Sequence, residues 1–374
     1  MLSLRWRRIV IKVGSALIAP TANGCSTRYL LSIAHFIGEC RALGIEVVLV
    51  SSGSVAAGKN AIAFAHHPLP INIKQAMAAV GQTEMMATWS HLFDFRCAQI
   101  LLTHDDFANR RRYLNIDNTL RTLLANQVLP IINENDSVAT AELKVGDNDN
   151  LAAMVAILVD ADALIICSDI DGLYSANPKT DANAIFIPLV ASINADIYAM
   201  AGASHHSIGT GGMVTKLQAA EKATRQGVDT LIINGQHGAN FDRLLAGQAT
   251  GTLFQRQQDR VSAKKHWLLH SIKSTGSIVL DNGAVNALLQ KGASLLAKGV
   301  LNSVGQFDKG DAVWLCNESG QQLAKGISQY SAIELQLIKG QHSQDIAQIL
   351  GFCPSEVVVH RDDIALGMAE QVCK

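Results

Sequence analysis

The chain has 374 residues, of which 48% are hydrophobic and 17% are charged, and its net charge at pH 7 is −1. This length exceeds one ordinary domain of roughly 100–200 residues, so we expect two domains with substantial cores. The balanced charge excludes a general attraction to nucleic acid or to an anionic membrane. The basic start is followed by a short apolar run that Lys12 interrupts, so we expect no signal peptide or membrane span and a cytoplasmic location.

The seven cysteines are scattered, and none forms a C-x-x-C pair. Several stand inside apolar runs. We expect buried thiols in a reducing compartment. The residues are Cys25, Cys40, Cys97, Cys167, Cys316, Cys353 and Cys373.

Short apolar runs rich in Val and Ile alternate with helix-length segments over the first 250 residues or so. Several runs are unbroken, as in strands that are buried on both faces. The alternation predicts a mostly parallel sheet with helices on both faces, and ligands gather at the carboxyl ends of such strands. The predicted strands are residues 9–13, 45–50, 97–102, 128–132, 163–167 and 230–234, and the predicted helices are 29–43, 73–91, 113–126, 151–159 and 215–226.

A dense group of amide and carboxylate side chains follows the strand at residues 128–132. Buried polar groups need hydrogen-bond partners, so such a group indicates a binding site for a small polar ligand with an amino group, or a site that organises catalytic lysines. A solvated acidic loop is the alternative. Residues 137–146 alternate apolar and polar side chains and predict a small hairpin. The group contains Asn133, Glu134, Asn135, Asp136, Glu142, Lys144, Asp147, Asn148, Asp149 and Asn150.

The segment Gly53-Ser-Val-Ala-Ala-Gly58-Lys59-Asn60 matches the G-x-x-x-x-G-K pattern of a P-loop. However, Asn60 stands where a P-loop needs a Ser or Thr hydroxyl for magnesium. We therefore prefer a glycine-containing turn in which backbone N–H groups and Ser52 bind a carboxylate at the start of a helix.

Two lysines stand at positions that suit an anion. Lys216 follows the glycine-rich residues 209–212 at the start of a predicted helix, although a flexible loop is the alternative there. Lys12 ends an apolar strand just before Gly14, either as a snorkelling edge residue or as a ligand for negative charge. Two lysines with carboxylates between them are the arrangement that phosphoryl transfer needs.

The composition changes after residue 255. Residues 256–275 are polar and basic and predict a linker, and the short runs 277–280, 312–315 and 356–360 between many glycines predict a small β-rich domain. We expect a first domain at 1–255, a second at 276–363, and a C-terminal extension of helical character at 364–374. Residues 276–374 carry seven Lys and Arg against ten Asp and Glu, so we predict no appreciable RNA affinity, although an RNA-binding protein is the rival from another class.

Six motifs in chain order resemble those of the glutamate 5-kinases, within the amino acid kinase family. The second domain, with Lys298-Gly-Val300 and His360-Arg-Asp-Asp363, resembles the PUA domain that many of these enzymes carry. The resemblance implies a three-layer α/β/α sandwich with a mostly parallel sheet, followed by a small β-rich PUA barrel. The motifs are Lys12-Val-Gly-Ser15, Ser51-Ser-Gly-Ser54, Ile132-Asn-Glu-Asn-Asp136, Lys144-Val-Gly-Asp-Asn-Asp-Asn150, Ser168-Asp-Ile-Asp-Gly-Leu-Tyr174 and Gly209-Thr-Gly-Gly-Met213.

The same resemblance implies ATP-dependent phosphorylation of the γ-carboxylate of L-glutamate, the first step of proline biosynthesis. It implies proline as a feedback inhibitor, a homotetramer or dimer, and a glutamyl phosphate reductase as partner. Mg²⁺ is implied by ATP chemistry, riding on the nucleotide phosphates, and no metal-ligand set stands out in the sequence. Other kinases of the family, acting on acetylglutamate, aspartate or a nucleotide, remain the nearest alternatives. Residues 203–208 depart from the pattern, which puts proline sensitivity in doubt.

The resemblance also assigns residues to roles. Lys12 and Lys216 would stabilise the moving phosphoryl group, and Asp149 would orient them. Glutamate would be bound by Ser52, Gly53, Asp136 and Asn148, with Lys144 and Asp147 near it. The nucleotide would be bound by Lys12, Ser168, Asp169, Thr210, Gly211, Gly212, Met213, Val214, Thr215 and Lys216.

Overall fold

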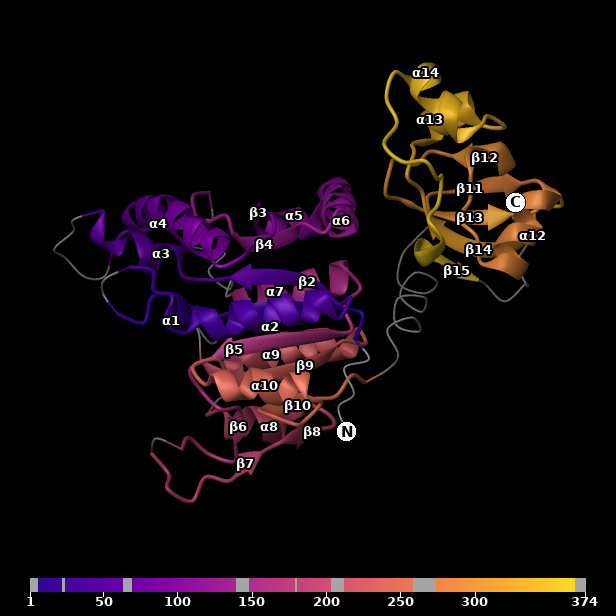
Figure 1. Cartoon of the computed structure of the whole chain (residues 1–374). Helices are drawn as coiled ribbons and strands as arrows, with labels where there is room; N and C mark the ends of the chain where they lie inside the picture. Colours follow the sequence, from indigo (N-terminus) through magenta and orange to yellow (C-terminus); the bar gives the residue numbers. More distant parts are fainter. Residues whose placement is uncertain are drawn as a thin grey trace. The chain divides into compact units, whose positions relative to one another are not determined.

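The computed structural model describes residues 6–21, 24–62, 69–138, 148–178, 180–202, 212–257 and 274–366. These residues form two compact units, one mainly before and one mainly after the gap at residues 258–273 (Figure 1). The predicted hairpin at 137–146 lies almost entirely outside the described residues.

The first unit is built on one sheet, whose described strands run in the order β3-β4-β2-β1-β5-β9-β10-β8. The six strands from β3 to β9 pair in parallel, whereas β10 is antiparallel to β9. All six strands predicted from the apolar runs are therefore confirmed, as is the mostly parallel sheet. The strands are β1 (Arg8–Val13), β2 (Glu46–Ser51), β3 (Cys97–Leu102), β4 (Leu129–Glu134), β5 (Ala163–Ser168), β8 (Leu189–Val190), β9 (Asp229–Asn234) and β10 (Thr252–Phe254), and β6 (Leu173–Tyr174) pairs with β7 (Phe186–Ile187) apart from the sheet.

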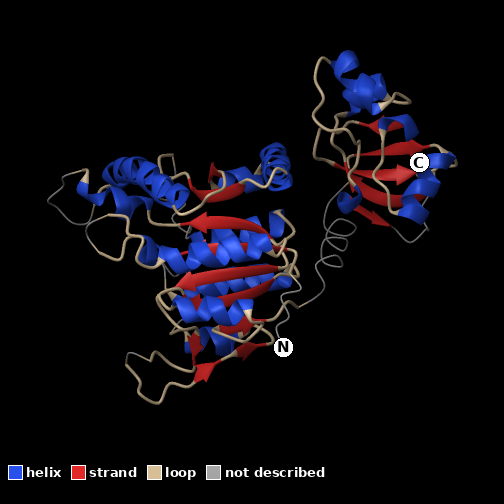
Figure 2. Ribbon diagram, in the orientation of Figure 1, coloured by secondary structure: helices blue, strands red, loops and turns tan. Residues whose placement is uncertain are grey.

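Helices cover both faces of this sheet, so the three-layer prediction is confirmed (Figure 2). Ile9, Ile11 and Val13 of β1 pack into the core shared with α2 and α10, whereas α7 and α9 pack on the other face. Because side chains alternate along a strand, Lys12 points toward the face that α7 covers. The helices are α1 (Ser15–Ile18), α2 (Leu30–Ala42), α3 (Ser54–Ala57), η1 (Gly58–Asn60), α4 (Ile71–His91), α5 (His104–Ala108), α6 (Arg110–Ala125), α7 (Asn148–Leu158), α8 (Ala195–Met200), α9 (Met213–Arg225) and α10 (Gly238–Leu245).

The P-loop-like segment is part of a close helix crossing. A Cβ atom on Gly58 would lie 1.9 Å from the carbonyl oxygen of Met77, and one on Gly81 would lie 1.9 Å from the carbonyl oxygen of Ser54. The two glycines therefore let α3 and η1 pack directly on the backbone of α4. Lys59 is exposed. The glycine pattern serves helix packing, which agrees with the rejection of a P-loop.

The second unit is a five-stranded sheet in the order β12-β11-β13-β14-β15, flanked by short helices. Two sequence predictions are wrong here. Residues 356–360 form no strand, although Val359 makes an isolated bridge to Leu295. The segment from Ile364 is not helical at its start but pairs with β14. The elements are β11 (Gly276–Leu280), α12 (Asn282–Lys291), η4 (Ala297–Gly299), β12 (Val300–Gly305), β13 (Ala312–Cys316), β14 (Gln322–Ile327), α13 (Ala332–Ile338), η5 (Ser343–Asp345), α14 (Ile346–Leu350), η6 (Arg361–Asp363) and β15 (Ile364–Leu366).

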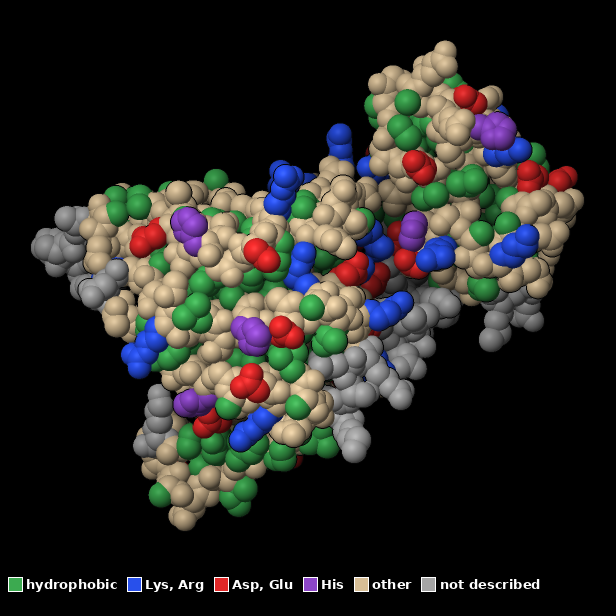
Figure 3. Space-filling view, in the orientation of Figure 1, with side chains coloured by type: hydrophobic (Ala, Val, Ile, Leu, Met, Phe, Trp, Pro, Cys, Tyr) green, Lys and Arg blue, Asp and Glu red, His purple; other side chains and the backbone are tan. Residues whose placement is uncertain are grey.

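Charges of both signs are interspersed over the face of the second unit that Figure 3 shows. In the described parts of the chain, no helix is long and apolar enough to cross a membrane. Of the cysteines, Cys40, Cys167 and Cys316 are buried, whereas Cys353 is exposed, which corrects the expectation of uniformly buried thiols. Burial raises the pKa of Cys40 and of Cys167 to about 12, so both thiols are neutral at pH 7.

Candidate active site

Asp149 is the centre of a buried group of charges. Its Oδ1 lies 2.5 Å from Nζ of Lys12, and its Oδ2 lies 3.1 Å from Nζ of Lys216. Asp149 is fully buried, and the two lysines are 3% and 8% exposed. A buried charge is tolerated only when it is paired, and here one carboxylate pairs with two ammonium groups. The group keeps a net positive charge, which suits an anionic ligand.

Local structure fixes each member of this group. Lys12 is held by β1, which lies at the centre of the sheet. Asp149 stands in the first turn of α7, where the helix dipole favours a carboxylate. The backbone of Gly14 lies close to the Lys12 ammonium group, since a Cβ atom on Gly14 would be 3.8 Å from Nζ of Lys12. Strand β1 and helix α7 thus bring together Lys12 and Asp149, which are far apart in the sequence.

The start of α9 delivers the second lysine. Gly212 precedes the helix with φ of +84°, a backbone conformation that favours glycine. Thr215 donates its hydroxyl to Oδ2 of Asp149 at 2.9 Å, so the helix start is joined to α7 by a hydroxyl as well as by Lys216. The sequence placed Thr215 near the nucleotide but did not reveal this contact.

A second polar group follows β2 and β4. Ser54 donates its hydroxyl to Oδ2 of Asp136 at 2.7 Å. Burial raises the pKa of Asp136 above its ordinary value, and the hydrogen bond from Ser54 opposes that shift. Ser52 is 8% exposed, and its N–H donates to the carbonyl oxygen of Val13 at 3.0 Å. Gly53 has φ of +105°, so this turn depends on glycine.

Three amide side chains link α4, β4 and α7. Asn148 donates Nδ2 to Oδ1 of Asn133 at 3.0 Å, and Asn133 donates Nδ2 to Oε1 of Gln82 at 2.9 Å. Sequence reasoning did not single out Gln82. Its signal was a glutamine among Ala78, Gly81 and Met85, on the buried stripe of α4.

A third polar group follows β5 and β9, on the other side of β1. Ser168 accepts a backbone hydrogen bond from Gly235 at 2.8 Å and donates its hydroxyl to Asp169 at 3.2 Å. Asn234 donates its side-chain amide to Oδ1 of Asp171 at 2.9 Å. Asp169 is exposed, whereas Asn234 is 5% exposed. The loop after β5 is therefore anchored at its base and open at its tip.

The strand order arranges these groups in a row. The group at Ser52 and Asp136 lies after β2 and β4, Lys12 is the second-last residue of the central strand β1, and the group at Ser168 lies at the carboxyl ends of β5 and β9. The arrowheads of β2 and β5 point to the same edge in Figure 1. Two polar sites with a cationic centre between them suit the transfer of an anionic group from one ligand to another.

Four predicted site residues lie outside the described residues, namely Lys144, Asp147, Thr210 and Gly211. The structure brings Lys12, Asp149, Thr215 and Lys216 into contact. Asp136 contacts Ser54, and Asn148 contacts Asn133. Within the described ranges, no three His, Cys, Asp or Glu side chains form a metal-binding cluster.

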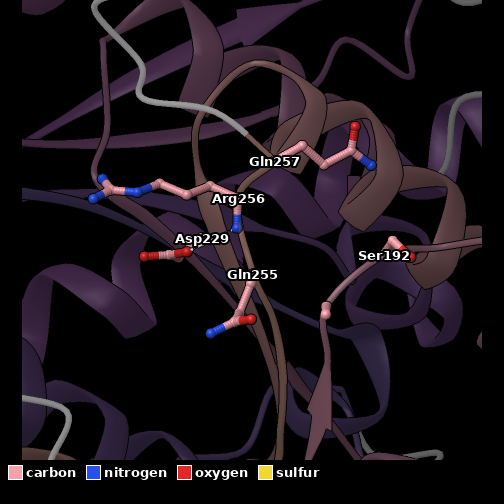
Figure 4. Close-up of a pocket in the computed structure, with 6 residues that line it drawn as sticks. Ser192, Asp229, Gln255, Arg256 and Gln257 are labelled. Atoms are coloured by element: carbon pink, nitrogen blue, oxygen red, sulfur yellow. Dashed lines mark hydrogen bonds between the residues drawn. The ribbon is translucent and has the colours of Figure 1, made fainter.

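An open polar cavity of about 630 Å³ lies elsewhere in the first unit (Figure 4). Its lining includes Asp229, which begins β9, and Arg256, which follows β10. The polar groups described above lie at the carboxyl end of β9, so this cavity stands at the opposite end of that strand. We assign it no part in the chemistry.

Comparison with known proteins shows the family to which the chain belongs. The family model described as "Amino acid kinase family" matches residues 7–234. The chain belongs to the amino acid kinase family. The PUA domain model matches residues 276–350 of the second unit. The chain is therefore a kinase with a β-rich PUA domain after its catalytic sheet.

Two similar proteins share one name. A protein named Glutamate 5-kinase from Idiomarina loihiensis is 56% identical over 362 residues, covering 96% of this chain and 98% of the relative. Another of that name from Salinibacter ruber is 50% identical over 366 residues, covering 96% and 97%. Among solved structures, a UMP kinase from Bacillus anthracis is 17% identical, with a TM-score of 0.48, and covers 68% of this chain and 97% of its own.

Proposed function

We propose that this kinase phosphorylates the γ-carboxylate of L-glutamate with ATP, giving L-glutamyl 5-phosphate and ADP. The observation that carries the proposal is Asp149, which joins Lys12 and Lys216 between two polar groups on either side of β1. The names and full-length coverage of the relatives support glutamate as the acceptor.

The reaction needs no general base. A side-chain carboxylate has a pKa of about 4, so it is ionised at pH 7 and is already a nucleophile. Its oxygen forms a bond to the γ-phosphorus, while the bond from that phosphorus to the β,γ-bridging oxygen breaks and ADP leaves. Negative charge spreads over the transferred group in the transition state. Lys12 and Lys216 supply the positive charge that stabilises it.

Asp149 acts as an orienting residue in this scheme. It holds Lys12 from β1 and Lys216 from α9 in one place, and the hydroxyl of Thr215 reinforces the contact. Because the ammonium groups are held before the reaction begins, little reorganisation is needed as charge develops.

The acceptor belongs on the side of β2 and β4. We assign the glutamate to Ser52, Gly53, Asp136 and Asn148, with Lys144 and Asp147 near it. A carboxylate at Asp136 matches the α-ammonium group of an amino acid, and the N–H groups at the turn around Gly53 match a carboxylate.

The nucleotide belongs on the side of β5 and β9. Gly212 and the start of α9 offer backbone N–H groups to phosphates, and Lys216 stands one turn into that helix. We assign the nucleotide to Lys12, Ser168, Asp169 and residues 210–216. Because lysines engage the carboxylate of Asp149 at the centre, the donor set fits Mg²⁺ carried on the nucleotide phosphates, where it would add positive charge.

The remaining assignments go with the proposed activity. They are feedback inhibition by proline, a homotetramer or dimer, a glutamyl phosphate reductase as partner, and a cytoplasmic location. We also propose a kinase domain at 1–255, a linker at 256–275, and a PUA domain that starts at 276 and, because β15 belongs to its sheet, reaches Leu366.

Trapping of the acyl phosphate tests the function. Hydroxylamine converts it to a hydroxamate, so the purified chain is assayed with ATP and Mg²⁺ on L-glutamate, N-acetylglutamate and aspartate, with proline added to a parallel set. We expect a signal with L-glutamate alone. A signal with a different acid would move the substrate assignment, and no signal with any acid would refute the activity.

A further inference from the structure

The three-amide chain from α4 to α7 is the feature that the proposed mechanism leaves unexplained. Its members are Gln82, Asn133 and Asn148, from three elements that are separate in sequence. Gln82 is 8% exposed and Asn133 is 1% exposed. Buried side-chain amides lower stability unless their hydrogen bonds are made. These three residues therefore need hydrogen-bond partners, which apolar residues of similar size would not need.

The hydrogen bonds of the amide chain all run in one direction. Each amide donates to the next in the order Asn148, Asn133, Gln82. This order leaves Oδ1 of Asn148 as an acceptor at one end and Nε2 of Gln82 as a donor at the other. Both atoms are buried, and neither has a hydrogen-bond partner among the described residues. A buried acceptor at Asn148 is completed when a ligand brings a donor to it.

The two ends of the amide chain adjoin the acceptor group and the charged centre of the active site. Asn148 directly precedes Asp149, the residue that holds the two lysines. Gln82 follows Gly81, which packs on the carbonyl oxygen of Ser54, and Ser54 in turn binds Asp136. The amide chain therefore spans the region between the acceptor group and the start of α7.

We propose that Gln82 is a positioning residue for the acceptor site, which acts through Asn133 to orient the side chain of Asn148. With Asn148 so oriented, its Oδ1 accepts a hydrogen bond from the acceptor substrate. At neutral pH the donor that glutamate offers is its α-ammonium group. This inference rests on the proposed function, and it makes the acceptor an acid with a free amino group.

Substitution of Gln82 tests this role in the full-length chain. Gln82→Leu keeps the size of the side chain but removes its hydrogen bonds, and we expect the KM for L-glutamate to rise about fivefold to tenfold, the effect of losing one buried hydrogen bond. The KM for ATP should stay within about twofold. Thr83→Ala, at the exposed neighbouring position on α4, is the control and should change neither value.

A second variant separates positioning from folding. Gln82→Met is neutral and unbranched like glutamine but has no amide, so its KM for L-glutamate should rise as in Gln82→Leu. If Gln82→Leu unfolds, as thermal melting would show, Gln82→Met carries the test. A KM for L-glutamate that is unchanged in folded Gln82→Leu or Gln82→Met would overturn the proposal.

The double variant tests whether the effect passes through Asn148. If it does, adding Gln82→Leu to Asn148→Ala should raise the KM no further than Asn148→Ala alone. Two effects that multiply would show that Gln82 acts by another route and would overturn the inference. The unmodified chain distinguishes the two proposals, because turnover of a different acid would refute glutamate as substrate, and the variants would then be compared with that acid.

Discussion

Replacement of Asp149 by Asn removes the charge that joins the two lysines while keeping the size of the side chain. Both carboxylate oxygens face ammonium groups, at 2.5 Å and 3.1 Å, in a fully buried position. Removing one partner of a buried ion pair costs about 3–5 kcal/mol, because the remaining charge is left without compensation. In Asp149→Asn two ammonium groups are left together, so we expect a loss in this range.

The loss is measurable by thermal melting. For a domain of about 150–250 residues, each kcal/mol lowers Tm by roughly 2–4 °C. Turnover should fall by more than the loss of folded protein explains. We expect kcat to drop by about 10²–10³, the range found when one preorganised electrostatic contact to a transition state is lost. The matched control is Asp196→Asn, an exposed carboxylate in the first turn of α8, which should change the free energy of unfolding by no more than about 0.5 kcal/mol.

A double variant separates the loss of stability from the loss of turnover. Adding Lys216→Met to Asp149→Asn removes one of the two uncompensated ammonium groups, so part of the lost stability should return while kcat stays low. If Asp149→Asn melted like the unmodified chain and kept kcat within about threefold, Asp149 would not be the residue that organises the lysines.

Three further predictions follow from the same contacts. Lys12→Ala and Lys216→Ala should lower kcat far more than they raise the KM for glutamate, whereas equal effects on both constants would contradict the assignment to the transferred phosphoryl group. Burial raises the pKa of Asp136 and the Ser54 hydroxyl opposes that shift, so Ser54→Ala should raise the pKa further. Ionised Asp136 binds the substrate ammonium, and this ionised form is lost as pH falls. The acidic limb of the pH profile of kcat/KM for glutamate should therefore move to higher pH in this variant. A limb that stays in place would exclude Asp136 as the group that titrates there. Gly81→Ala should destabilise the chain by about 3 kcal/mol or more in urea unfolding, since its Cβ would overlap the backbone of α3, and a normal midpoint would mean that the helices can separate freely.

Part of the fold could be predicted because the pattern is local. The six central strands are short apolar runs, and a strand buried on both faces needs such a run whatever its neighbours are. The edge of the first sheet was missed, because β8 has two residues and β10 has three. In the second unit, the run at 356–360 has strand-like residues but no continuous strand to pair with, and only Val359 bridges to Leu295.

The sequence alone determined the type of chemistry. The sequence has amides and carboxylates after a buried strand, and two lysines beside glycines. Such side chains need polar partners, either a ligand or each other, and this need is evident before their positions in space are known. The sequence also argued against a P-loop at residues 53–60, because Asn60 lacks the hydroxyl that a P-loop needs at that position.

Only the tertiary structure decided which of these groups meet. Strand order places β1 between β2 and β5, and that order depends on pairings between segments far apart in the chain. Consequently, Asp149 contacts both Lys12 and Lys216, which are 137 and 67 residues away along the chain. The link to Gln82 depends on tertiary structure in the same way, because Asn133, which donates to the side-chain oxygen of Gln82 on α4, lies on strand β4.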